Sequence, residues 1–125
     1  MAETIKLFRS LLLLFFIFGQ GYGQQCSKRD LSIKLNATGK SIGGKPEFIL
    51  TISNNCVCPQ SNVLIRCFGL STVEPVDPAI CKPVDNNNCL INNGTAIVKG
   101  HPISFKYAWL IPTDFSVVNS TVVCS

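Results

Sequence analysis

Apolar and polar side chains alternate in the stretch Leu31-Ser32-Ile33-Lys34-Leu35-Asn36. Successive side chains of an extended strand point to opposite faces of a sheet, so this period of two predicts a strand with one buried face and one face in water. The pattern recurs at Phe48, Leu50 and Ile52 and ends at Asn54-Asn55. Residues 39–44 contain three glycines and predict a turn between the two strands.

Further strands are predicted at residues 63–68, 97–98, 103–111 and 115–124. Cys67 shares a face with Val63 and Ile65, so we expect it in the core, where a disulfide could cross between sheets. Prolines at 75, 78 and 83 remove backbone donors, so residues 73–88 are predicted to be mostly loop with at most a short edge strand. Several short strands separated by turns favour one all-β domain, an antiparallel β-sandwich.

The N-terminal segment has the layout of a secretory signal peptide. An apolar run at residues 11–18 follows Lys6 and Arg9, and Gly21 and Gly23 supply the small side chains expected before a cleavage site. We therefore predict a leader at residues 1–23 and a mature domain at residues 24–125. The run is shorter than the roughly 20 apolar residues that cross a bilayer, and no lipid-anchor signal ends the chain, so we expect a secreted protein without a membrane anchor.

Seven cysteines follow the predicted leader, and in an oxidising compartment they are expected to form disulfides. A disulfide typically stabilises a domain by about 2–4 kcal/mol, so three would be comparable to the net stability of about 5–15 kcal/mol of a small domain. Because seven is odd, at least one cysteine stays free or bonds another chain, and the pairing of the others stays open. Cys56 and Cys58 are separated by one residue and should reach different partners.

Three Asn-x-Thr acceptors for N-glycosylation begin at Asn36, Asn93 and Asn119. Asn36 falls on the polar face of the first predicted strand, as a glycan requires. Together with the leader, the three acceptors favour passage through the secretory route and predict that these asparagines face solvent.

The sequence offers no recognisable catalytic, metal or nucleic-acid site. Loss of the leader leaves a formal charge of +3, and apart from Lys28-Arg29 the basic residues are scattered, so no nucleic-acid-binding stripe is predicted. The carboxylates match no glycosidase signature, and His101 is the only histidine. The cysteine spacing lacks the gaps typical of zinc sites, so we predict no metal and no other cofactor. Lys28-Arg29 is either a proteolytic processing site or the solvated edge of a strand.

Phe105, Tyr107 and Trp109 occupy alternate positions of one predicted strand, so their rings share a face. A buried row would fill the core of the sandwich, whereas an exposed row could stack on the sugar rings of a polysaccharide. Burial of Trp109 distinguishes these two hypotheses.

A series of motifs follows in order along the mature chain. They are Gly44-Lys45-Pro46-Glu47-Phe48, Ile52-Ser53-Asn54-Asn55-Cys56, Cys67-Phe68-Gly69, Val76-Asp77-Pro78, Cys89-Leu90-Ile91-Asn92-Asn93-Gly94 and Phe105-Lys106-Tyr107-Ala108. In order and spacing they resemble the tapetum determinant family of small secreted plant signalling proteins. Six cysteines fall where that pattern expects them, at Cys26, Cys56, Cys58, Cys67, Cys89 and Cys124, although the gap between the second and third is shorter than expected. Cys81 stands where the family more often has an aromatic residue, which makes it the candidate free or intermolecular thiol.

The resemblance implies a ligand that acts in the apoplast on the ectodomain of a leucine-rich-repeat receptor kinase and influences cell fate in the anther or another plant tissue. We place the receptor contacts in the proline-rich loop at residues 73–83, at Glu74, Val76 and Asp77, because loops on a rigid scaffold often carry recognition. The alternative from a different class is a module that binds cell-wall polysaccharide through the aromatic row.

Overall fold

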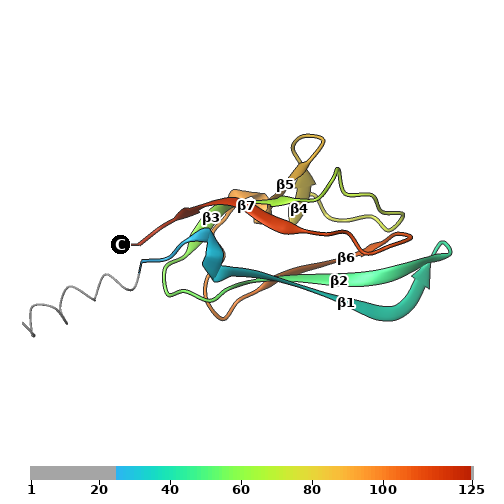
Figure 1. Ribbon diagram of the computed structural model, residues 1–125, viewed down its shortest axis with the longest axis horizontal. Coiled ribbons are helices and arrows are strands. Elements are labelled where there is room, and N and C mark those ends of the chain that lie inside the picture. Colours follow the sequence, from blue (N-terminus) through green and yellow to red (C-terminus); the bar gives the residue numbers. More distant parts are fainter. Residues whose placement is uncertain (1–24, 125) are drawn as a thin grey trace, which may run out of the picture.

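Two antiparallel sheets stacked face to face form the described part of the chain. The computed structural model describes residues 25–124, so the predicted leader and its cleavage site lie outside the described residues. Figure 1 shows the two layers, and both contribute residues to one core. This arrangement confirms the predicted all-β antiparallel sandwich. The elements are η2 (Lys28–Asp30), β1 (Leu31–Ile42), β2 (Lys45–Asn54), β3 (Gln60–Arg66), β4 (Cys81–Pro83), β5 (Asn88–Ile91), η3 (Asn92–Gly94), β6 (Ile103–Ala108) and β7 (Ser116–Val122), where η marks a short 3-10 turn.

The first sheet has the strand order β1-β2-β6, and the second has the order β4-β5-β3-β7. The two strands expected from the alternating pattern pair as the hairpin β1–β2, with Ile33 opposite Ile52. At the turn, Gly43 and Gly44 have φ values of 56° and 78°. A tight hairpin turn needs this left-handed backbone, and glycine adopts it without a steric penalty.

The second sheet contains a strand that the sequence pattern does not predict. β5 follows a run of asparagines that is typical of a turn, and its pairing depends on β3, where Ile65 lies opposite Cys89. β4 is the short edge strand allowed for in residues 73–88. Three strands end before their predicted ends, since β3 ends at Arg66, β6 at Ala108 and β7 at Val122. In the predicted strand at residues 97–98, Ile97 forms only a single bridge, to Gln60.

The aromatic row is largely part of the core. Phe105 and Tyr107 are 6% and 0% exposed, and Trp109 is half-buried against the same cluster. The Tyr107 ring lies 5.4 Å from the ring of Phe48 and meets the Phe115 ring edge to face, also at 5.4 Å. The structure therefore favours the core interpretation of this row.

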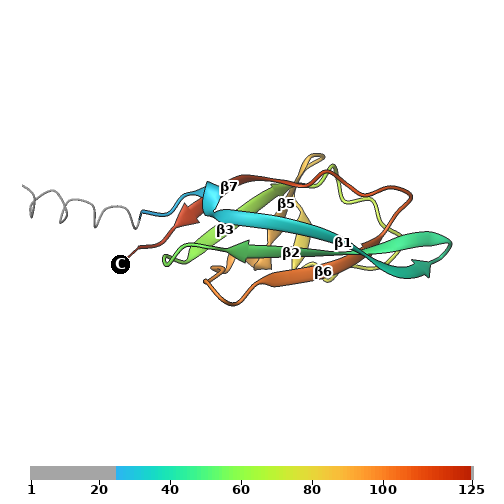
Figure 2. The same ribbon diagram turned by 60° about the horizontal axis from the view of Figure 1, so that its bottom comes forward.

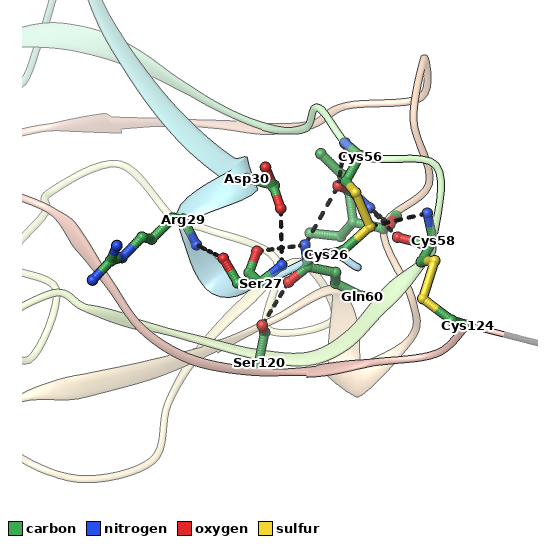
Figure 3. The surroundings of a disulfide bond; sticks show 11 residues. Cys26, Ser27, Arg29, Asp30, Cys56, Cys58, Gln60, Ser120 and Cys124 are labelled. Carbon is green, nitrogen blue, oxygen red and sulfur yellow. Dashed lines mark hydrogen bonds between the residues drawn. A yellow bond between two sulfur atoms is a disulfide. The ribbon is translucent and has the colours of Figure 1, made fainter. Parts of the chain in front are cut away.

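Both described termini lie at one end of the sandwich (Figures 1 and 2). Two disulfides, drawn in Figure 3, close this end. Cys26 is bonded to Cys56, and Cys58 is bonded to Cys124, across sequence separations of 30 and 66 residues. The expectation that Cys56 and Cys58 reach different partners is confirmed. The first and last described segments are thus attached to the turn between β2 and β3.

Buried amides beside these disulfides have hydrogen-bond partners. The Asn54 side-chain nitrogen donates to the carbonyl of Cys58 at 2.9 Å. Gln60 donates to the Ser27 carbonyl at 2.9 Å and accepts from the Ser120 hydroxyl at 2.6 Å (Figure 3). Buried polar groups are costly unless they are paired. Disulfides and buried hydrogen bonds therefore stabilise this end of the molecule.

The third disulfide joins Cys67 to Cys89 within the second sheet. Cys67 is fully buried, as expected. The expectation of a bridge between sheets is wrong, because Cys89 lies in β5, beside β3 of the same sheet. Cys81 is a free thiol, 1% exposed, and burial raises its pKa to about 12. Of the two alternatives for Cys81, the structure favours a free thiol over one that bonds another chain.

Candidate functional site

An apolar groove opens at the end of the sandwich opposite the disulfide-closed termini. Residues 67–73 and 109–115 form two loops that lie side by side there, near the β1–β2 hairpin (Figures 1 and 2). The groove between them has a volume of about 400 Å³. Phe68 and Ile111 on its walls are 52% and 67% exposed. The residues that line it are Cys67, Phe68, Ser71, Trp109, Ile111, Pro112, Thr113 and Asp114.

The loop at residues 67–73 is attached firmly where it leaves β3. The Cys67–Cys89 disulfide fixes its base to β5. The backbone nitrogens of Cys67 and Phe68 both donate to the Asn87 carbonyl, at 2.8 Å and 3.1 Å. These contacts fix the backbone at Phe68, a residue that is half exposed.

Three consecutive residues of this loop have left-handed backbone. Phe68, Gly69 and Leu70 have φ values of 52°, 79° and 56°, and the Leu70 nitrogen closes the turn by donating to the Cys67 carbonyl at 2.8 Å. Glycine and asparagine adopt this conformation readily, but for a bulky side chain it is strained. Among the described residues, Phe68 and Leu70 are the positive-φ positions that are neither glycine nor asparagine.

Contacts with β6 position both groove loops. At the far end of the first loop, the Ala108 nitrogen donates to the Thr72 hydroxyl at 3.0 Å, and the Val73 nitrogen donates to the Ala108 carbonyl at 2.9 Å. In the second loop, the Thr113 nitrogen donates to the buried Tyr107 hydroxyl at 3.0 Å. The groove is therefore built from two loops with fixed positions.

The proline-rich segment at residues 73–83 presents only part of its predicted contact set to solvent. Asp77 is exposed, and its carboxylate accepts a hydrogen bond from the Ala79 nitrogen at 2.9 Å. Val76 packs against the core, and Glu74 is half-buried. Of the three residues expected to contact a receptor, the geometry gives Glu74 and Val76 a role in positioning the loop.

Glu74 forms a pair of carboxyl groups with Glu47 of β2, which is 3% exposed. The Thr38 hydroxyl donates to the Glu47 carboxylate at 2.7 Å, and this bond lowers the pKa of Glu47. Burial raises the pKa of Glu74, and the hydrogen bond and negative charge of the adjacent Glu47 raise it further. Lys106 and Lys40 partly offset the charge of the pair.

A second hollow, of about 340 Å³, lies between the edge strands β1 and β7. Lys28 and Arg29 lie at this hollow in η2, which is capped by the Ser27 hydroxyl, and the Lys28 ammonium donates to the Val118 carbonyl at 3.2 Å. Both basic residues are exposed, so neither interpretation of the pair is excluded by burial. The hollow is lined by Lys28, Arg29, Leu31, Ile33, Phe115, Ser116 and Val117.

The three glycosylation acceptors, Asn36, Asn93 and Asn119, are all exposed, and none lies in the two groove loops. His101 is also exposed. In the described part of the chain, the clusters of metal-ligating atoms that lie close enough together consist mainly of cysteine sulfurs at the closed end of the sandwich. Those sulfurs are bonded in disulfides, so they lack the thiolate that a metal requires. Over residues 25–124, no helix has the length and apolar character needed to span a membrane.

The C-terminal family model described as "Tapetum determinant 1, C-terminal" matches residues 27–125. The chain belongs to the tapetum determinant family. It is 33% identical over 88 residues to "TPD1 protein homolog 1" of Arabidopsis thaliana, which covers 69% of this chain and 49% of the relative. It is 28% identical over 88 residues to "TPD1 protein homolog 1A" of Oryza sativa subsp. japonica, covering 64% of this chain and 39% of the relative. The chain thus matches half or less of the length of these relatives, and no solved structure matches it.

Sequence reasoning did not single out the groove in this tapetum determinant protein. Phe68 and Ile111 are 43 positions apart, and they line one groove because the loop after β3 is hydrogen-bonded to the end of β6 through Thr72 and Ala108. The sequence did contain a local signal at Phe68. Val63, Ile65 and Cys67 alternate on the buried face, so the next residue, Phe68, is a large apolar side chain outside that face, directly before Gly69.

Proposed function

We propose that this member of the tapetum determinant family is a secreted signalling ligand that binds the ectodomain of a leucine-rich-repeat receptor kinase in the apoplast and influences cell-fate specification in the anther or another plant tissue. The observation that carries the proposal is the family match over residues 27–125, whose description refers to the tapetum, a tissue of the anther. The proposal includes a leader at residues 1–23 and glycans at the exposed acceptors.

The architecture supports a role in binding. Three disulfides and the paired amides beside two of them hold the described domain in one shape. A protein that is ordered before it binds loses less conformational entropy on association, so more of the contact energy appears as affinity. The proposed mode of action is therefore presentation of a preformed surface, without catalysis.

The proposed receptor surface includes the exposed part of the proline-rich loop. Asp77 is solvent-facing, and Val73 is 44% exposed, so both are available to a partner. Glu74 and Val76 contribute by holding the loop against the sandwich. The polysaccharide alternative lacks its platform, because Phe105 and Tyr107 are buried, so we do not carry it forward.

Affinity capture tests this function. The oxidised, glycosylated mature domain is immobilised and exposed to a panel of purified leucine-rich-repeat receptor kinase ectodomains, with the same protein reduced and alkylated as control. We expect saturable binding of at least one ectodomain to the oxidised form alone. Failure to bind across the panel, with a folded protein, would count against the proposal.

A further inference from the structure

We propose that the apolar groove between residues 67–73 and 109–115 is the receptor-docking surface, with Phe68 and Ile111 as its apolar anchors and Asp114 at its rim. This inference rests on the proposed function and specifies where it takes place. The partner chemistry that fits is an apolar side chain that enters the groove, next to a basic or hydrogen-bond-donating group that meets Asp114.

The backbone at Phe68 supports this assignment. Its positive φ is strained for an aromatic residue, and the strained turn leaves 52% of the residue in water. Neither feature stabilises the isolated domain. Strain of this kind clusters at functional sites, where it holds a group ready for a partner. Large aromatic residues are also enriched among the few that dominate binding energy at interfaces.

Both walls of the groove are held in position by contacts with the sandwich. The Cys67–Cys89 disulfide and the Asn87 carbonyl anchor one loop, and the buried Tyr107 hydroxyl anchors the other through Thr113. A docking site on such loops needs little reordering when the partner arrives. The groove is therefore preformed in the free protein.

The exposed apolar area of the groove indicates which kind of partner occupies it. At 52% and 67% exposure, Phe68 and Ile111 present on the order of 200 Å² of side chain. A stable association of two copies buries roughly 800 Å² per partner, and obligate homodimer interfaces are largely apolar, so this patch is too small to form one. It suits the desolvated centre of a larger, mostly polar contact with a different protein.

The surroundings of the groove leave it accessible. No glycosylation acceptor lies in either groove loop, since Asn36 is in β1, Asn93 is in η3 and Asn119 is in β7. Glycans at those positions would cover other parts of the sandwich. Asp114 is exposed on the groove wall and places one negative charge beside the apolar surface.

The first test is Phe68→Asn, which removes the ring and puts a residue that tolerates left-handed backbone in its place. We expect the affinity for the captured receptor ectodomain to fall at least ~30-fold, as for the loss of an interface hot spot, while the melting temperature stays equal or rises. A residue with a purely structural role would lower the melting temperature instead. The matched control is Val98→Ser, which removes another exposed apolar side chain outside both groove loops and should leave the affinity unchanged within about threefold.

The second test places a glycan in the groove. Gly69→Asn creates a new Asn-x-Ser acceptor with Leu70 and Ser71, and a Cβ at position 69 has room, with its nearest contact 3.6 Å away. Expressed in a glycosylating host, this variant should lose detectable receptor binding. The control is the same Gly69→Asn protein after native treatment with an endoglycosidase that trims each N-glycan to a single sugar, and its affinity should be restored to within about fivefold of the parent treated in the same way.

The outcomes separate the two proposals. If the parent protein binds no ectodomain, the proposed function fails, and the docking surface fails with it. If the parent binds but Phe68→Asn and glycosylated Gly69→Asn bind equally well, the groove is overturned and the receptor function stands. If light scattering shows a dimer of the parent that Phe68→Asn dissociates, the occupant is a second copy and the inference is also overturned.

Discussion

At the scale of single residues, Cys81 is a thiol that the fold keeps away from water. It is 1% exposed and its pKa is raised to about 12, so the reactive thiolate is scarce at neutral pH. We expect iodoacetamide at about pH 8, near the ordinary pKa of a thiol, to leave the native protein unmodified and to add one adduct after unfolding in guanidinium without reductant. Intact-mass spectrometry measures both. An adduct on the native protein, or a disulfide-linked dimer, would show that Cys81 reaches the surface.

The carboxyl pair Glu47–Glu74 should make stability depend on pH. The raised pKa of Glu74 gives a contribution that is complete below the pKa of a free glutamic acid and is lost as pH rises through the raised value. The lowered pKa of Glu47 gives a contribution that is present above the free value and is lost as pH falls through the lowered one. Together they are most favourable near the ordinary pKa of glutamic acid, about 4.3.

Glu74→Gln tests this dependence because an amide cannot ionise and can still donate to Glu47. We expect the melting temperature of the variant, relative to the parent, to rise steadily as pH increases above about 4.3. Asp77→Asn makes the same charge change at an exposed carboxylate and should show no such trend. Parallel pH profiles for the parent and Glu74→Gln would mean that folding does not raise the pKa of Glu74.

At the scale of elements, the sequence predicts well those strands whose burial alternates over several residues. Leu31, Ile33 and Leu35 give β1 an unambiguous inner face, and the glycine-rich turn after it leads into β2. β5 has only four residues and follows Asn86-Asn87, so its local pattern is that of a turn, and pairing with β3 makes it a strand. The groove was not predicted for the same reason, since the loops that carry Phe68 and Ile111 are brought together only by long-range pairing.

The Cys58–Cys124 disulfide should be the strongest single constraint on these elements. It attaches the chain after β7 to the chain before β3 across 66 residues, and a cross-link of that loop length stabilises by about 4 kcal/mol through the entropy of the unfolded chain. We expect Cys58→Ala with Cys124→Ala to lower the free energy of unfolding by about that amount in urea titrations. A loss below about 1 kcal/mol would imply that the pairing of β7 with β3 is sufficient to hold the C-terminal strand.

At the scale of the whole molecule, two disulfides close one end of the sandwich, and the loops that form the groove lie at the other end. Figure 1 shows that the described C-terminus and these loops lie at opposite ends of the ribbon. Because the groove is confined to one end, we predict that glycans on the sheets of the sandwich do not affect receptor binding. A variant without acceptors is best made with Asn36→Gln, Thr95→Ala and Asn119→Gln. Thr38→Ala would remove the hydrogen bond to Glu47, and Asn93→Gln would place glutamine at a φ of 54°.

We expect mass spectrometry to show the loss of all three glycans from that triple variant and its affinity for the receptor ectodomain to match the parent within about threefold, since glycans on the sandwich lie outside the contact. The comparison with glycosylated Gly69→Asn is informative because both experiments change glycan content and only one of them changes the groove. Weaker binding by the triple variant, with an unchanged melting temperature, would mean that the partner contacts the sugars or the sheet faces that carry them. Equal binding by the triple variant, together with the loss of binding by glycosylated Gly69→Asn, would show that a glycan blocks the receptor at the groove and not on the sheets.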